Sequence, residues 1–268
     1  MKYDPIKRTL GNVFGRSVFM RKLFYRLLDI LLLRAWHIHR ELRNWKRVAS
    51  PEANILDAGS GFGQYSWYMS RMSARYTILG LDVKDEQVAD CNHFFRELGT
   101  DRVSFRVGDL LELKDENKYD LVLCVDVMEH IEEDVRVMSN YCRSLKPGGM
   151  LMISTPSDQG GSDVHEDDES SFIEEHVRDG YGEEDMKSKL QQAGFSKSKV
   201  MYSYGKPGQI SWRLSMKYPL LMLNVSKLFF VVLPFYYLLV MPLALLLNYL
   251  DSTRTHASGT GLIVLAWK

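Results

Sequence analysis

The sequence predicts an α/β fold in which a mostly parallel, Rossmann-like sheet carries helices on both faces. The segment ILDAGSGFGQYS, at residues 55–66, consists of a strand-like apolar run, a glycine turn and the start of a helix. A second apolar run ends at Asp82, and further strand-like runs lie within residues 103–113, 119–131 and 145–155. Strands that alternate with helical segments are typical of a parallel sheet covered on both faces.

The glycine turn predicts a ligand site at the end of the first strand. Gly59, Gly61 and Gly63 allow the backbone to approach a ligand where a Cβ atom would collide, and a helix is expected from about Gln64. A dinucleotide fingerprint would place its third glycine one residue later. The acid Asp57 precedes the turn, which suits a cationic ligand better than a pyrophosphate.

The turn resembles motif I of the class I S-adenosylmethionine (SAM) methyltransferases, and the strands within residues 54–155 follow in that family's order. The resemblance implies a sheet of seven strands with the last one antiparallel, and SAM as cofactor. An acid about twenty residues beyond the glycines, here Asp82, can accept the ribose hydroxyls, and the resemblance places adenine beside Asp109. The expected cofactor-binding residues are Asp57, Gly59, Gly61, Gly63, Tyr65, Asp82, Val83, Gly108, Asp109, Leu110, Val125 and Asp126.

The candidate catalytic residues follow the fourth strand. Asp126, Glu129 and His130 form a D-x-x-E-H motif. It resembles the E-x-x-E-H of ubiquinone and small-RNA O-methyltransferases, which together with a later histidine, here His176, can hold a divalent metal. Such ligands suit Mg²⁺, Mn²⁺ or Zn²⁺, although Asp126 is shorter than the family's glutamate. Two alternatives remain: His130 acts as a general base without metal, or His130 only packs at the start of a helix.

Charge is distributed unevenly along the chain. Residues 1–47 contain 12 Lys/Arg and 3 Asp/Glu, residues 48–204 contain 16 and 30, and residues 205–268 contain 6 and 1. Basic ends predict a negatively charged partner, either anionic lipid or nucleic acid. Both ends also carry long apolar runs, which argues against the wet, polar interface that nucleic acid requires. We therefore expect an anionic membrane surface.

Residues 18–47 predict one long helix with basic and apolar faces. Arg21, Lys22, Arg26 and Arg34 alternate there with leucine and aromatic residues. Such a helix is typical of a bilayer interface. It could equally cap the sheet, as N-terminal helices of the resembling family do, and the two interpretations are compatible. The first residues carry charges throughout, so we expect that they are not a secretory signal.

Residues 228–250 contain no charged side chain and have the length of a membrane span. We expect residues 198–205 and 259–268 to be the sixth and seventh strands, paired antiparallel. The segment between them must then leave and return on one side of a membrane. Two crossings need about 40 apolar residues, so we expect short helices, broken near Pro234 and Pro242, that dip into one leaflet. The alternative is an apolar dimer interface or lid.

The expected organisation is a basic helical segment (1–48), a SAM-binding core (49–205), an apolar membrane-facing insertion (206–258) and a final strand (259–268). The expected function is O-methylation of a hydrophobic, membrane-partitioned small molecule such as a quinone precursor, a phenolic lipid or a lipid headgroup. Its expected location is the cytoplasmic face of a membrane, as a peripheral or monotopic protein. The alternatives are N- or C-methylation of a lipid, or a SAM-binding scaffold in a complex of biosynthetic enzymes.

Overall fold

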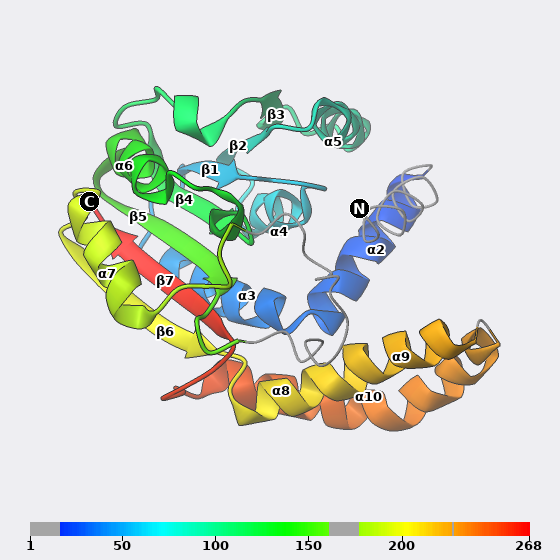
Figure 1. Ribbon diagram of the computed structural model, residues 1–268. Helices are drawn as coiled ribbons and strands as arrows, with labels where there is room; N and C mark the ends of the chain where they lie inside the picture. Colours follow the sequence, from blue (N-terminus) through cyan, green and yellow to red (C-terminus); the bar gives the residue numbers. More distant parts are fainter. Residues whose placement is uncertain (1–16, 161–176, 227) are drawn as a thin grey trace.

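The computed structural model describes residues 17–160, 177–226 and 228–268. A seven-stranded sheet forms its centre, with the order β3-β2-β1-β4-β5-β7-β6 (Figure 1). The strands are β1 Asn54–Ala58, β2 Thr77–Asp82, β3 Val103–Val107, β4 Tyr119–Val125, β5 Leu145–Pro156, β6 Lys197–Ser203 and β7 Gly261–Trp267. The α/β fold class predicted from the sequence is confirmed.

Strand β7 lies between β5 and β6 and runs antiparallel to both. The strands β1 to β5 pair in parallel, so β6 has the same direction as they have. The expected antiparallel pairing of the last two strands is confirmed. Since β6 ends at the edge where β1 and β4 end, the chain between β6 and β7 starts at the edge where a cofactor is expected.

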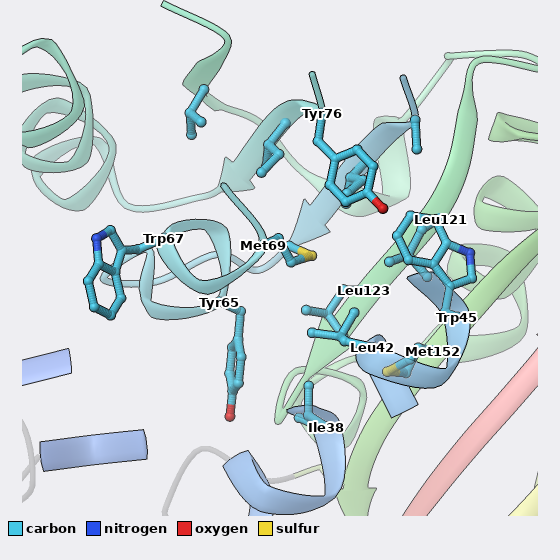
Figure 2. Packing of buried hydrophobic residues seen from close by; sticks show 14 of the residues in the cluster. Ile38, Leu42, Trp45, Tyr65, Trp67, Met69, Tyr76, Leu121, Leu123 and Met152 are labelled. Carbon is cyan, nitrogen blue, oxygen red and sulfur yellow. The ribbon is translucent and has the colours of Figure 1, made fainter. Parts of the chain in front are cut away.

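The helices divide between the two faces of the sheet. On one face α3, α4 and α5 bury apolar side chains, and on the other α6 and α7 do so. Strand β4 serves both cores, because successive side chains point to opposite faces. Figure 2 shows the first core, where Ile38 and Leu42 of α3 approach Leu123 of β4. These helices are α3 Leu33–Lys46, α4 Gln64–Met72, α5 Asp85–Glu97, α6 Asp134–Ser144 and α7 Glu183–Gln192, with short turns η1 Leu110–Glu112 and η2 Met128–His130.

The prediction of one long N-terminal helix is wrong. Two helices form, α2 Val18–Leu31 and α3, with extended backbone at Leu32 (φ −88°, ψ 111°) between them. The break lets α3 bury Ala35, Ile38 and Leu42 against the sheet, a packing gain that a straight helix would forfeit. Helix α2 instead leaves an apolar stripe exposed. Packing against the sheet, one of the two interpretations of this segment, is therefore observed for α3, and the bilayer-interface interpretation of α2 stays a prediction.

The insertion between β6 and β7 is a helical hairpin that extends beyond the sheet (Figure 1). Its first arm comprises α8 Lys206–Trp212, the π-helical turn η3 Arg213–Lys217 and α9 Tyr218–Val225, and its second arm is α10 Phe229–Thr253. The expectation of short helices broken at the prolines is wrong, because α10 is one 25-residue helix that contains both Pro234 and Pro242. Each proline removes one donor, and helical hydrogen bonds continue around it.

Helix α10 is the one described helix that is long and apolar enough to cross a membrane. Much of its surface is open to solvent, with Phe235 69%, Leu238 74% and Leu239 80% exposed. Large apolar side chains exposed in one contiguous patch mark an interaction surface. The two arms are tied to each other by Tyr236 and Tyr237, whose hydroxyls donate to the carbonyls of Leu214 and Ser215 at 2.7 and 2.9 Å.

Asp251 fixes the base of the hairpin to the core. Its fully buried carboxylate accepts hydrogen bonds from His37 Nε2 at 2.8 Å, the Tyr204 amide at 3.1 Å and the Gly208 amide at 2.9 Å. These donors come from α3, the exit of β6 and α8. Burial alone would raise the pKa of Asp251, but the hydrogen bond from His37 and the other donors lower it below its usual value. The hairpin is thus joined rigidly to the edge where β6 ends.

Candidate functional site

The candidate site lies at the carboxyl ends of β1, β2 and β4, where open α/β sheets bind ligands. The turn between β1 and α4 contains Gly59, Gly61 and Gly63, all with left-handed backbone (φ 73°, 48° and 73°). A Cβ at Gly59 would come within 2.3 Å of Val127, and one at Gly63 within 3.1 Å of Phe105. Beside Gly61 the nearest atom would be 4.0 Å away, so this glycine alone of the three faces room for a ligand.

Asp82 ends β2 next to this turn. Its two carboxylate oxygens accept hydrogen bonds from the Gly61 amide at 2.8 Å and the Lys84 amide at 3.0 Å. A carboxylate has about four acceptor sites, so Asp82 can accept further bonds from a ligand such as a ribose. Val83, predicted to contact the cofactor, is 65% exposed directly after it.

Asp57 lies at the end of β1 but is buried, and its carboxylate accepts a hydrogen bond from the Ser66 hydroxyl at 2.6 Å. Burial raises the pKa of Asp57 to about 6, while the bonds from Ser66 oppose the shift. Tyr65 is buried too, and burial raises the pKa of its hydroxyl to about 12 against the nearby charge of Arg34. Both predicted residues are thus buried beneath the turn, and Asp57 holds the first turn of α4 through Ser66.

The exit of β3 brings a third acid to the same edge. Asp109 is exposed and accepts a hydrogen bond from the Leu111 amide at 2.9 Å, so it begins the short turn η1. The Gly108 amide donates to the Asp82 carbonyl at 3.0 Å, and Leu110 is buried. The predicted residues after β1, β2 and β3 therefore occupy adjacent ends of neighbouring strands.

The exit of β4 places Val125 and Asp126 at this edge. Asp126 has left-handed backbone (φ 52°), and its amide donates to the Ser154 carbonyl at 2.8 Å. Its carboxylate forms an ion pair with Arg34 of α3. The Arg34 amide donates to the Tyr204 hydroxyl at 3.1 Å. The start of α3 thus joins the exits of β4 and β6, a contact that the sequence analysis missed.

Glu129 and His130 point to different environments. Glu129 is 1% exposed and accepts a hydrogen bond from the Thr155 hydroxyl at 3.1 Å. Burial raises the pKa of Glu129, and hydrogen bonds to its carboxylate, including the one from Thr155, oppose the shift. His130 is exposed on the short turn η2. Neighbouring residues of a 3₁₀ turn point about 120° apart, which separates these two side chains.

The expected metal ligands do not assemble among the residues that the structure describes. No group of three or more His, Cys, Asp or Glu side chains there could hold a metal ion. Asp126 forms an ion pair with Arg34, Glu129 is buried and hydrogen-bonded to Thr155, and His130 is exposed to solvent. His176 lies outside the described residues. The donors present do not fit a metal, and we assign no step to one.

Helix α2 clamps the glycine turn, a contact that we did not predict from the sequence. Arg21 is buried and donates to the Phe62 carbonyl at 3.0 Å, and the Tyr25 hydroxyl donates to the same carbonyl. Gln64, the first residue of α4, donates to Asp29 of α2 at 2.7 Å. An arginine and a tyrosine at helical spacing i, i+4 within an apolar helical segment are the signal that could have located this contact.

Comparisons with known proteins agree with this architecture. Residues 49–201, more than half of the chain, match the family described as "Methyltransferase domain". A ubiquinone biosynthesis O-methyltransferase of Xanthomonas campestris is 32% identical over 111 residues. That match covers 41% of this chain and 45% of the relative, so the chain spans less than half of this curated relative.

Solved structures share the fold at lower identity. Phosphoethanolamine N-methyltransferase 2 of Haemonchus contortus, in complex with SAM, is 21% identical with a TM-score of 0.60, over 86% of this chain and 52% of that one. The cyclase SpnF is 20% identical with a TM-score of 0.57, over 85% and 80% of the two chains. Enzymes of different chemistry therefore share this fold, and the acceptor must be argued from the site.

Proposed function

The chain belongs to the class I SAM-dependent methyltransferases, and on this premise we propose that it methylates a hydroxyl oxygen of a hydrophobic small molecule dissolved in a membrane. The observation that carries the proposal is the exposed apolar hairpin, which begins at the same sheet edge as the cofactor turn. An acceptor in a bilayer would meet the enzyme at that edge. N- or C-methylation of a lipid and a SAM-binding scaffold remain the alternatives.

The residues at this edge fit SAM. Bound SAM would supply a methyl group already activated on its sulfonium. Open space beside Gly61 admits a ligand against the backbone, and Asp82 keeps acceptor capacity for ribose hydroxyls. The exposed carboxylate of Asp109 is the third group that would hold the cofactor. Asp57 would act indirectly, by holding Ser66 and the first turn of α4.

The remaining chemical task is the removal of one proton. Methyl transfer needs an acceptor oxygen in line with the methyl carbon and a base for the hydroxyl proton. We assign the base to His130, whose imidazole is exposed at the end of η2, the turn that follows β4. Glu129 is a positioning residue, because its buried bond to Thr155 fixes η2 against β5. The ion pair of Arg34 with Asp126 closes the same edge from the side of α3.

The hairpin supports contact with one leaflet of a bilayer. In its first arm the segment beyond Lys217 is the 8-residue helix α9, about 12 Å long at 1.5 Å per residue. The hydrocarbon core is about 30 Å thick, so a full crossing would place Lys217 and Arg213 inside it. The exposed face of α10 continues along the helix to Tyr249, which is 56% exposed. The hairpin would therefore lie along the interface on one side.

The O-methyltransferase assignment is supported by the curated relative, which is named for ubiquinone biosynthesis. By that likeness we propose a quinone precursor or another phenolic lipid as acceptor. We also propose the cytoplasmic face of a membrane as its location, and we retain the division into 1–48, 49–205, 206–258 and 259–268 as the functional organisation. The basic N-terminal segment would add attraction to anionic lipid.

A shortened variant tests the role of the hairpin. Residues 218–243 would be replaced by a short Gly-Ser linker, which keeps the buried base residues Ala244, Asn248 and Asp251. We expect unchanged SAM affinity and loss of activity on a membrane-dissolved phenol, with activity retained on its short-chain soluble analogue. If the shortened variant and the original protein were equally active on the membrane-dissolved acceptor, the proposal would be refuted.

Lipid analysis tests the acceptor class. Lipids from cells with and without the protein would be compared by mass spectrometry. We expect a phenolic or quinone-related species lighter by one methylene to accumulate in its absence. A missing methyl group on a soluble metabolite, with all lipids unchanged, would contradict a membrane-dissolved acceptor.

A further inference from the structure

A cavity of about 300 Å³ lies between α3 and the last turns of α10, and no residue of the glycine turn lines it. Its wall contains Asp29, Trp36, His39, Arg40, Arg43, Tyr249, Ser252 and Thr253. The four residues from α3 are spaced i, i+3, i+4 and i+7, which puts them on one helical face. Two guanidinium groups and two aromatic rings therefore line one small volume.

Of the two arginines in the wall of this cavity, only Arg40 forms an ion pair with an acid in the described ranges. Arg43 donates to the neutral Tyr68 hydroxyl at 3.2 Å and forms no ion pair with any residue in the described ranges. Arg40 is paired with Glu41 at 2.7 Å and donates to the Ser252 carbonyl, so it is fixed at the junction of α3 and α10. A planar guanidinium donates several parallel hydrogen bonds, which matches the oxygens of a phosphate.

A buried polar atom in the same wall has no partner. His39 is 7% exposed, and its Nε2 atom makes no hydrogen bond, although Asp29 Oδ1 lies 3.5 Å away. The ring stacks on Tyr68 with centroids 3.5 Å apart. Burial, with the charge of Arg43, lowers the pKa of His39 to about 3, so the ring is neutral. A buried polar atom without a partner is costly, so a small shift of the ring that lets a ligand oxygen accept from Nε2 would be favourable.

Two exposed apolar stripes end at this cavity. The stripe on α2 comprises Phe19, Leu23, Leu27 and Ile30, of which Ile30 follows the cavity residue Asp29. The exposed face of α10 ends at Tyr249, itself a cavity residue. Figure 1 shows α2 and the hairpin extending outward from α3. Aromatic residues such as Trp36 and Tyr249 are typical of the level of lipid headgroups.

We propose that this cavity binds the phosphate of a phospholipid headgroup. Arg43 and Arg40 would pair with the phosphate, His39 Nε2 would donate to one of its oxygens, and the acyl chains would lie along the apolar stripes. Burial raises the pKa of the Asp29 carboxyl group, against the hydrogen bond from Gln64 at 2.7 Å, so Asp29 takes up a proton more readily than a solvated aspartate when a phosphate approaches. This inference rests on the membrane contact proposed above. Beyond the general contact of the apolar hairpin with a membrane, it predicts one specific binding site for a lipid phosphate.

The first test compares Arg43→Gln with Arg47→Gln. Arg47 caps the same helix and is exposed but does not line the cavity. On vesicles of phosphatidylcholine alone, which carry no net charge, we expect Arg43→Gln to weaken partitioning at least about tenfold and Arg47→Gln to leave it unchanged. On vesicles of phosphate-free galactolipid both variants should match the original protein. Unchanged SAM affinity would confirm that both variants are folded.

Two outcomes of this test separate the two proposals. If the original protein partitions onto vesicles but Arg43→Gln and Arg47→Gln behave alike on phosphatidylcholine, the lipid site is wrong and the membrane contact stands. If the original protein partitions onto no vesicle, the membrane contact itself fails, and this inference fails with it.

The second test distinguishes a lipid from free phosphate. Arginine modification by phenylglyoxal would be mapped by mass spectrometry with phosphatidylcholine vesicles, with inorganic phosphate, and with neither. We expect the vesicles to protect Arg43 but not Arg47, and inorganic phosphate at the same phosphate concentration to protect neither. Equal protection of Arg43 by inorganic phosphate would identify a soluble phosphate site instead, and no protection by vesicles would overturn the assignment.

Discussion

Gly61 provides the sharpest test of the cofactor site, because the three glycines of its turn have different surroundings. Gly61 and the distant Gly148 share left-handed backbone (φ 48° and 75°) and open space around a built Cβ. Replacing either by alanine therefore introduces backbone strain without a collision. Gly148 lies within β5, where the pairing with β4 shifts register between Leu145 and Met150; it is far along the chain from the site and serves as the matched control.

The magnitudes follow from the same geometry. Alanine in left-handed backbone costs about 1–2 kcal/mol, so Gly61→Ala and Gly148→Ala should lower the free energy of unfolding by similar amounts. The added methyl group beside Gly61 would also enter the volume that SAM occupies. Overpacking of this kind costs about 1–3 kcal/mol, which corresponds to a roughly 5- to 150-fold increase in the Kd for SAM.

Titration calorimetry with SAM and chemical denaturation would measure both quantities. We expect Gly148→Ala to bind SAM as the original protein does, while Gly61→Ala binds it more weakly at equal stability. Gly59→Ala should lose more stability than either, because its Cβ would meet Val127. An unchanged Kd in Gly61→Ala would show that the open space beside Gly61 is not where the cofactor binds.

Three further predictions concern buried acids and the proposed base. Burial raises the pKa of Asp57 to about 6, so the charged carboxylate lowers the stability of the folded protein above pH 6 but not below the unfolded pKa of about 4. Asp57→Asn should therefore raise the Tm of the SAM-free protein at pH 8. An equally large rise in Tm at pH 4 would contradict this reasoning. Asp251→Asn should lower the free energy of unfolding by about 3 kcal/mol, because three donors lose a buried carboxylate. A decrease of less than about 1 kcal/mol in urea denaturation would refute the claim that Asp251 fixes the hairpin to the core. His130→Gln should lower kcat by about 10²–10⁴ with unchanged SAM affinity, whereas Glu129→Gln should change kcat less; the reverse order would make Glu129 the base.

The sheet was predictable because its signals are local. Strand-like runs that end in acids and a turn with three glycines lie within short windows of sequence, and the structure places them at adjacent strand ends. The antiparallel pairing of the last strands was also predictable, and it correctly placed an apolar insertion between β6 and β7. The roles of individual site residues stay predictions.

The errors arose where tertiary packing overrides local pattern. Nothing in the residues around Leu32 breaks a helix, and the chain turns there because α3 gains burial against the sheet. Pro234 and Pro242 predicted breaks, but α10 continues through both. The pairing of Arg34 with Asp126, 92 positions apart, left no periodic signal to find.

The place of β7 in the sheet has a consequence for biogenesis. This strand separates β5 from β6, yet a ribosome reaches it only after both arms of the hairpin have been synthesised. Until then β5 has an unpaired edge and β6 has no neighbour, while the most apolar surface of the chain has already emerged. Early capture of the hairpin by a bilayer or a chaperone would shield that surface during the interval. Closure of the sheet is then the last step in the folding of this chain.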